Sequence, residues 1–213
     1  MQKASRIARL LSTLLLAGFA CSAATLLDTS SALTLTDPTQ MGRLSRNGIP
    51  QDWAGSEPFP GVINTTTLYH YTVFSLNVGS NAFIQVDFDS VSANTFVSAY
   101  RGAYLPNSGG GPNFGFDANW LGDAGFSGNF FGTDPIFFQV IVPVNNNLLV
   151  VVNNTAAGDD GVGDPFRLIV EGFLDANFTE APEPSAFFLL VGGAALLAAV
   201  CGRSGRRSRQ KFE

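Results

Sequence analysis

The most restrictive feature of this chain is a series of short runs rich in Val, Ile, Phe and Tyr, separated by Gly, Asn and Asp. β-Branched and aromatic residues favour strands, and turn residues between the runs interrupt any helical period. Ile84, Val86 and Phe88 alternate with Gln85 and Asp87, which indicates a strand with one buried face. The six runs are 67–76, 82–88, 95–100, 136–142, 148–152 and 166–173. They predict an all-β fold, an antiparallel β-sandwich or jelly-roll-like domain.

A different pattern occupies residues 185–202, where every side chain is apolar or small and none is charged. As a helix with a rise of ~1.5 Å per residue, this segment would be roughly 27 Å long, enough to cross a hydrocarbon core of ~30 Å. The basic residues Arg203, Arg206, Arg207 and Arg209 follow at once. Positive residues beside a span stay cytoplasmic, so the pattern predicts a single transmembrane helix at 185–202 and a cytoplasmic tail at 203–213.

The residues just before this span are Pro182, Glu183 and Pro184. The order of Pro-Glu-Pro, apolar run and arginine cluster resembles the PEP-CTERM sorting signal of Gram-negative bacteria, a segment also labelled an ice-binding protein C-terminal region. The resemblance implies recognition by the membrane transpeptidase exosortase, removal of the hydrophobic tail, and an exported protein of a biofilm- and exopolysaccharide-forming bacterium. The alternative is an ordinary single-span anchor that is retained.

The N-terminal segment 1–23 has the pattern of a secretory signal peptide. Lys3, Arg6 and Arg9 precede an apolar stretch at 10–20, and small residues follow it. Cleavage after Ala23 is expected, with lipoprotein processing at Cys21 as the alternative. The chain then divides into an extension with the first strands (24–66), the sandwich core (67–174), a linker (175–184), the span and the tail. We expect export to the cell envelope or beyond it, with transient anchoring in the inner membrane.

The charge of the expected mature part differs from that of the whole chain. Residues 24–184 carry four arginines and sixteen carboxylates, a net charge of −12. Such a body repels nucleic acid, and it attracts calcium or cationic polymers. Both cysteines, Cys21 and Cys201, belong to the targeting segments, so the exported domain has no disulfide and no thiol nucleophile.

The order of strands and turns in the body also resembles the bacterial pre-peptidase C-terminal (PPC-like) β-sandwich. The segments that carry this resemblance are 74–76, FVSAY ending at Tyr100, NWLGDAG at 119–125, VIVPVNNNLLVVV and FRLIVEGF. The resemblance implies an accessory sandwich module without chemistry of its own.

The sequence holds few residues suited to catalysis. His70 is the only histidine, which is too few for a zinc site, and no GxSxG-like nucleophile turn is present. Asp87 and Asp89 lie two apart on one predicted strand, as a pair of glycosidase carboxylates would, although the exposed face of an acidic protein looks the same. We therefore assign no catalytic residue.

Two groups of residues suggest ligands instead. Asp159, Asp160 and Asp164 lie in a glycine-rich loop and offer the oxygen ligands that calcium takes, or form a plain acidic turn. Tyr100, Tyr104 and Trp120 lie in or beside a long Gly-rich loop, where they would stack on sugars or bury a partner, or pack the loop onto its own core. We expect a non-enzymatic envelope or matrix protein that is structural or adhesive near exopolysaccharide. The alternatives are a glycan-binding module and a carbohydrate-active hydrolase.

Overall fold

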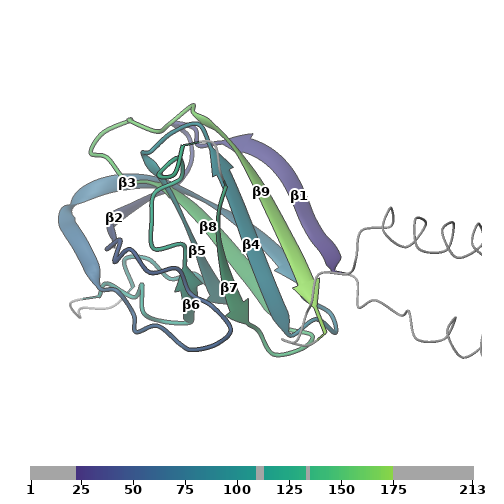
Figure 1. Ribbon diagram of the computed structural model, residues 1–213. Helices are drawn as coiled ribbons and strands as arrows, with labels where there is room; N and C mark the ends of the chain where they lie inside the picture. The colour runs from purple at the N-terminus through teal and green to yellow at the C-terminus, as the bar shows by residue number, and fades with distance from the viewer. Residues whose placement is uncertain (1–22, 109–112, 133–134, 175–213) are drawn as a thin grey trace, which may run out of the picture. The chain divides into compact units, whose positions relative to one another are not determined.

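The computed structural model describes residues 23–108, 113–132 and 135–174, and nearly all of its regular structure is β-strand. Figure 1 shows the strands packed in two layers. The strands are β1 (Ala24–Ala32), β2 (Thr39–Leu44), β3 (Val62–Asn77), β4 (Phe83–Ser90), β5 (Thr95–Arg101), β6 (Trp120–Asp123), β7 (Ile136–Ile141), β8 (Asn147–Asn154) and β9 (Pro165–Phe173). The expected all-β class and the two antiparallel sheets of a sandwich are confirmed.

The strand order defines the connectivity of the two sheets. One sheet has the order β1-β9-β4-β7 and the other the order β2-β3-β8-β5-β6, and all strand pairs within them are antiparallel. β2 is an edge strand of the second sheet. Without it each sheet has four strands, and their order is that of a jelly roll. Consecutive strands alternate between the sheets over much of the chain, so most of the pairings are long in sequence.

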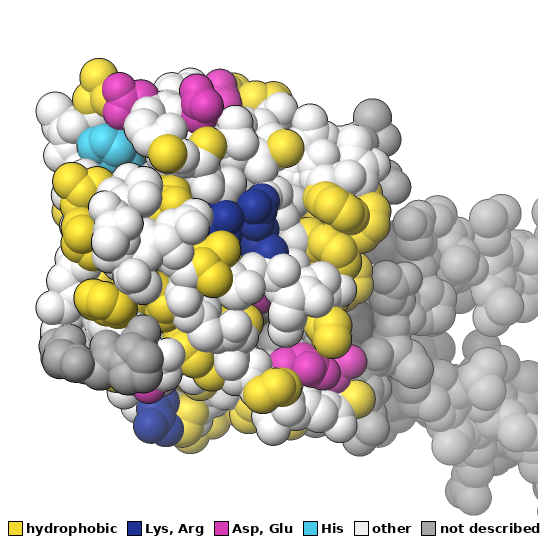
Figure 2. Space-filling view, turned by 90° about the vertical axis from the view of Figure 1, so that its left-hand side faces the viewer, with side chains coloured by type: hydrophobic (Ala, Val, Ile, Leu, Met, Phe, Trp, Pro, Cys, Tyr) yellow, Lys and Arg dark blue, Asp and Glu magenta, His cyan; other side chains and the backbone are white. Residues whose placement is uncertain are grey.

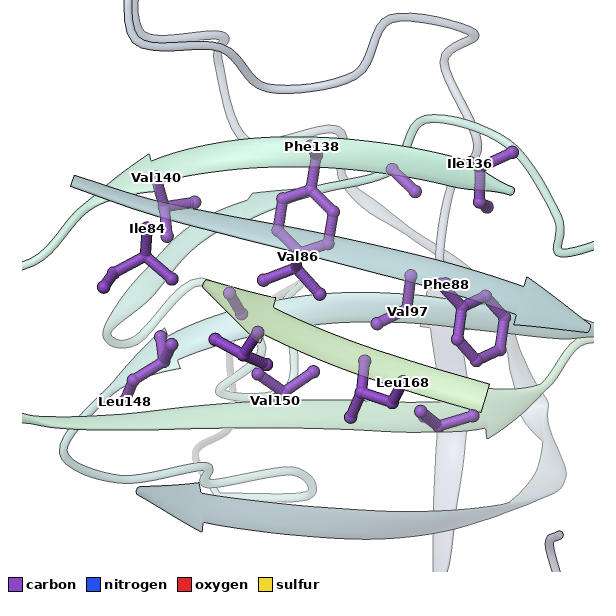
Figure 3. Packing of buried hydrophobic residues seen from close by; sticks show 14 of the residues in the cluster. Ile84, Val86, Phe88, Val97, Ile136, Phe138, Val140, Leu148, Val150 and Leu168 are labelled. Carbon is purple, nitrogen blue, oxygen red and sulfur yellow. The ribbon is translucent and has the colours of Figure 1, made fainter. Parts of the chain in front are cut away.

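The main core lies between the sheets, and Figure 3 shows its side chains pointing toward one another. Ile84, Val86 and Phe88 of β4 are fully buried, as the alternation in the sequence predicts. Their register partners on β7, Val140, Phe138 and Ile136, are also buried. From the other sheet, alternate residues of β8 and β5 fill the space opposite. Burial of a large aliphatic or aromatic side chain contributes about 1.5–3 kcal/mol, so this layer dominates the stability.

A second apolar layer covers the outer face of the five-stranded sheet. Phe96 and Tyr100 of β5 and Val151 of β8 point away from the main core, yet all three are at most 1% exposed. Their cover comes partly from the connection between β5 and β6, which supplies Tyr104 and Phe116. The sandwich is therefore a three-layer structure on this side, with an irregular segment as the third layer.

All six strands predicted from the sequence are present, with ends shifted by a few residues. The range 24–66, expected to hold an extension and the first strands, contributes β1, β2 and the start of β3 and is part of the sandwich. The strand β6 lies within the NWLGDAG segment, where sequence patterns are least informative because only four residues pair.

The predicted linker, sorting motif, span and basic tail lie outside the described residues, as does the predicted signal peptide except for its last residue, Ala23. Within the described part, no helix is long and apolar enough to cross a membrane.

Candidate functional site

One side of the sandwich, between the edge strands β6 and β7, is crossed by the long connection from β2 to β3. Gln51, in this connection, joins the two sheets through its backbone. Its N–H donates to the carbonyl of Asp123 in β6 at 3.0 Å, and its carbonyl accepts from the N–H of Gln139 in β7 at 2.8 Å. Edge strands otherwise present unpaired backbone groups, so this connection satisfies part of both edges.

The side chain of Gln51 then shapes the segment that follows it. Its amide Nε2 donates to the carbonyl of Gly55 at 2.6 Å, and its Oε1 accepts from the backbone N–H of Glu57 at 3.0 Å. Asp52 closes the turn, because its Oδ1 accepts from the N–H groups of Ala54 and Gly55 at 2.7 and 3.1 Å. Gln51 is buried whereas Asp52 is exposed, so the segment is held from within and keeps a carboxylate at the surface.

The close contact between this connection and β6 requires a glycine. A Cβ atom at Gly122 would lie 2.6 Å from the Gln51 side chain and 2.9 Å from that of Val140. Any larger residue would push the connection away from the strands, so Gly122 sets how closely the site residues approach the sheet edges.

Both tryptophans of the chain line one pocket of about 330 Å³ beside this bridge, here called the Trp pocket. Trp53 is fixed on three sides: its Nε1–H donates to the carbonyl of Val140 at 3.2 Å, and its ring meets Phe83 and Phe173 edge-on at 5.7 and 5.3 Å. Trp120 meets the ring of Phe59 edge-on at 5.6 Å. Each indole is half-buried, which leaves part of a rigidly held aromatic surface accessible.

The polar lining of the Trp pocket includes Gln51, Asp52, Ser56 and Glu57. The pocket therefore combines two aromatic faces with two carboxylates, an amide and a hydroxyl. Pockets that bind small molecules have this composition, in which apolar surface supplies contact area and a few polar groups fix orientation.

A larger and more apolar pocket of about 640 Å³, here called the Phe pocket, adjoins it and shares Gln51 and Asp52. Its apolar lining includes Ile49, Phe126, Phe131 and Phe137. Phe126 stacks against Phe130 at 4.7 Å and against Phe131 at 5.1 Å, while Phe131 and Phe137 are more than half exposed. Contiguous exposed apolar patches are a feature of binding surfaces, which makes this aromatic cluster a candidate contact surface.

Asp123, the last residue of β6 and the backbone partner of Gln51, is only 2% exposed. Its Oδ1 accepts from the N–H of Gly125 at 2.8 Å, but its Oδ2 has no hydrogen-bond partner among the described residues. Burial raises the pKa of this carboxyl to about 7, against the smaller opposing effects of the Gly125 N–H and the nearby Trp120. The Trp120 Nε1 is itself buried without a partner, so proximity to the carboxyl does not amount to a hydrogen bond in this geometry.

The three aromatic residues proposed from the sequence as ligand contacts lie in different places. Tyr100 is fully buried and Tyr104 packs on it at 4.6 Å with its hydroxyl donating to Gln40. Tyr104 belongs to the third layer and covers Tyr100 of β5, so both pack into the protein's own core, which is the alternative expected for these aromatic residues. Trp120 alone reaches the Trp pocket.

The acidic loop after β8 is shaped by Asn154, whose Nδ2 donates to the carbonyls of Ala156, Gly158 and Asp160. Asp159 and Asp160 are exposed, and no three carboxylate, histidine or cysteine side chains within the described ranges form a group that could hold a metal ion. Asp159 instead lies 3.8 Å from the Nε2 of His70. Figure 2 shows a histidine beside acidic side chains on this face. Calcium binding by Asp159, Asp160 and Asp164 stays a prediction.

The carboxylates considered for hydrolysis, Asp87 and Asp89, lie on the outer face of β4, away from the main core. Burial raises the pKa of Asp87, while Gln85 donates to both of its oxygens and lowers it. Burial also raises the pKa of Glu171, and the charge of Asp87 raises it further. Asp87 lines neither the Trp pocket nor the Phe pocket, and Asp89 lines a separate shallow pocket with Arg167.

Sequence reasoning missed Gln51, Asp52, Trp53 and Glu57. The QDW segment precedes a Gly/Pro-rich stretch and has no periodic pattern. Its one usable signal was Trp53, a large aromatic residue in an otherwise polar loop.

No family model matches the chain, and no curated protein matches it. Two solved structures show a distant likeness. One is a family 29 carbohydrate-binding module from Piromyces equi, 13% identical, with a TM-score of 0.26, covering 68% of this chain and 89% of that one. The other is the enzymatically active domain of tailspike protein 4 of bacteriophage CBA120, also 13% identical, with a TM-score of 0.27, covering 69% of this chain and 19% of that one. Likenesses this distant carry no functional argument.

Proposed function

We propose that the protein is an exported, non-enzymatic β-sandwich that binds glycans in the cell envelope or the extracellular matrix. The observation that carries this proposal is the Trp pocket, where the only two tryptophans of the chain flank Asp52 and Glu57. An adhesive role near exopolysaccharide follows, because a surface pocket that holds a sugar without reacting with it links the protein to the matrix.

The chemistry of the pocket suits a sugar ring. The C–H faces of a pyranose pack on an indole, and its hydroxyls exchange hydrogen bonds with carboxylate and hydroxyl oxygens. Trp53 is held by its hydrogen bond to Val140 and by two phenylalanine edges, so little side-chain entropy is lost when a ligand binds. The Phe pocket beside it extends the surface over which a chain of sugars would lie.

The route to the matrix in this proposal is the one expected from the two ends of the chain. A signal peptide at 1–23 directs export, and Pro182, Glu183 and Pro184 with the following span and arginines form a sorting signal for exosortase. Support for this route comes from the sequence pattern alone.

Binding to insoluble polysaccharides tests the function. We expect the protein to be retained by at least one matrix polysaccharide, and Trp53→Ala or Trp120→Ala to lower the bound fraction at least tenfold. Leu68→Ala is the matched control, since Leu68 is an exposed apolar residue on β3 outside both pockets. Trp53→Phe keeps an aromatic ring and should retain partial binding. Retention that is equal in all four variants would refute the site.

A further inference from the structure

The charge around the Trp pocket is one-sided. Asp52 and Glu57 line it, and none of the described residues that line it or the Phe pocket is a lysine, arginine or histidine. The described part of the chain contains twelve carboxylates and four arginines, which gives it a net charge of −8. Both the local and the overall field therefore favour a cation in the pocket and oppose an anion.

Three of the four arginines of the described residues are engaged elsewhere, and the fourth, Arg101, is exposed at the end of β5. Arg167 forms a two-pronged ion pair with Asp28 at 2.8 and 3.0 Å, between β9 and β1. Arg43 is 5% exposed and lies over the ring of Tyr69, and Arg46 donates to the hydroxyl of Ser127. Figure 2 shows basic side chains in the middle and at the lower left of that face, with the larger groups of acidic side chains at its top and lower right. Arg43, Arg46 and Arg167 are thus not available to neutralise the carboxylates of the pocket, and Arg101 is not among the described residues that line it.

The aromatic lining favours a cation independently of the carboxylates. An ammonium group over an indole face is attracted by the ring quadrupole, and tryptophan is the strongest of the aromatic partners. Two half-buried indoles and two carboxylates around one pocket of about 330 Å³ are the groups that hold ammonium ligands in proteins.

We propose that the Trp pocket selects glycans with free amino groups, the glucosamine-type polysaccharides, over neutral and anionic ones. This inference rests on the proposed function, since it names the class of glycan for the same pocket. The ammonium group lies over an indole and pairs with Asp52 and Glu57, while the ring carbons pack on the second indole. Uronate-bearing polymers are excluded by repulsion from the same two carboxylates.

Three hexasaccharides with the same β-1,4 backbone test the selection. They carry an ammonium group, an N-acetyl group or a hydroxyl group at C2: the glucosamine, N-acetylglucosamine and glucose hexamers. The full-length chain, purified in a mild detergent, is titrated with each at pH 5.5 and low salt. Binding is followed by calorimetry and by the fluorescence of Trp53 and Trp120. We expect the glucosamine hexamer to bind at least tenfold more tightly than the glucose hexamer, with the advantage lost as salt is raised.

The double variant Asp52→Asn, Glu57→Gln isolates the charge. Both changes keep the oxygen that accepts a hydrogen bond, so the turn at Ala54 and Gly55 is preserved. We expect the variant to bind the glucosamine hexamer no more tightly than the glucose hexamer, with the latter affinity unchanged. Asp89→Asn, which removes an exposed carboxylate from β4, is the control and should keep the preference.

The outcomes separate this inference from the proposed function. Equal binding of the glucosamine and glucose hexamers, lost in Trp53→Ala, overturns the selection for amino groups and leaves glycan binding intact. A preference that survives in the double variant overturns the assignment to Asp52 and Glu57. Absence of binding for all three hexamers and for the matrix polysaccharides overturns both proposals.

Discussion

Asp123→Asn removes a buried ionisable group at the end of β6. The carboxyl group is 2% exposed, receives one hydrogen bond from Gly125, and has a pKa raised from 3.8 to about 7 by burial. Between about pH 4 and pH 7 the unfolded chain releases this proton while the folded protein keeps it. The folded state then binds more protons than the unfolded state, so the free energy of unfolding falls as the pH rises through this window.

The size of the effect follows from the shift of the pKa. A shift of about three units at ~1.4 kcal/mol per unit gives a loss of about 4 kcal/mol between pH 4 and pH 8, as an order of magnitude. Asparagine has the same shape, keeps an oxygen for the Gly125 N–H, and does not ionise. The stability of Asp123→Asn relative to the unmodified protein should therefore rise by about 4 kcal/mol over this range, leaving the variant the more stable of the two at pH 8.

Urea unfolding at pH 4.5, 6 and 8, followed by tryptophan fluorescence, measures this difference. Comparing the two proteins at each pH cancels the titration of the other carboxyls, including Asp87 and Glu171, whose pKa values are raised as well. Asp160→Asn controls for the loss of one exposed negative charge. A stability difference between Asp123→Asn and the unmodified protein that stays constant across the three pH values would refute the reasoning.

Three further predictions concern the core, the acidic loop and the C-terminal segment. Val86→Asp places an unpaired charge in the main core and should cost more than about 4 kcal/mol in urea unfolding, whereas Val73→Asp, at a position 38% exposed on β3, should cost far less. Calcium at millimolar concentration should raise the melting temperature by several degrees, and Asp160→Asn with Asp164→Asn should remove the increase; an equal increase with magnesium would reduce the loop to an acidic turn. Protein isolated from the native host should end near Pro184 by intact-mass spectrometry, and a chain that keeps its arginine tail would leave only the retained anchor.

The fold class and the strands of the core follow from local patterns in the sequence. Residues such as Ile84, Val86 and Phe88 repeat with a period of two, and turn residues bound the runs, so both the strands and their buried face are local properties. The sequence predicts a jelly-roll-like domain, but it does not predict which strands pair. Pairing of β1 with β9, more than a hundred residues apart, depends on how the whole chain closes its core.

Which aromatic residues are available to a ligand depends on contacts between segments that are far apart in the chain. Tyr100 and Trp120 are partners in the β5–β6 ladder, yet one is fully buried under the third layer and the other reaches a pocket. The Trp pocket forms because the backbone of Gln51 connects β6 and β7. This connection needs a glycine at position 122, and it needs the hydrogen bonds of Gln51 with Asp123 and Gln139, which lie far from it in the chain. Contacts of this kind leave no periodic pattern in the sequence, because each depends on one backbone group meeting another across the gap between two sheets.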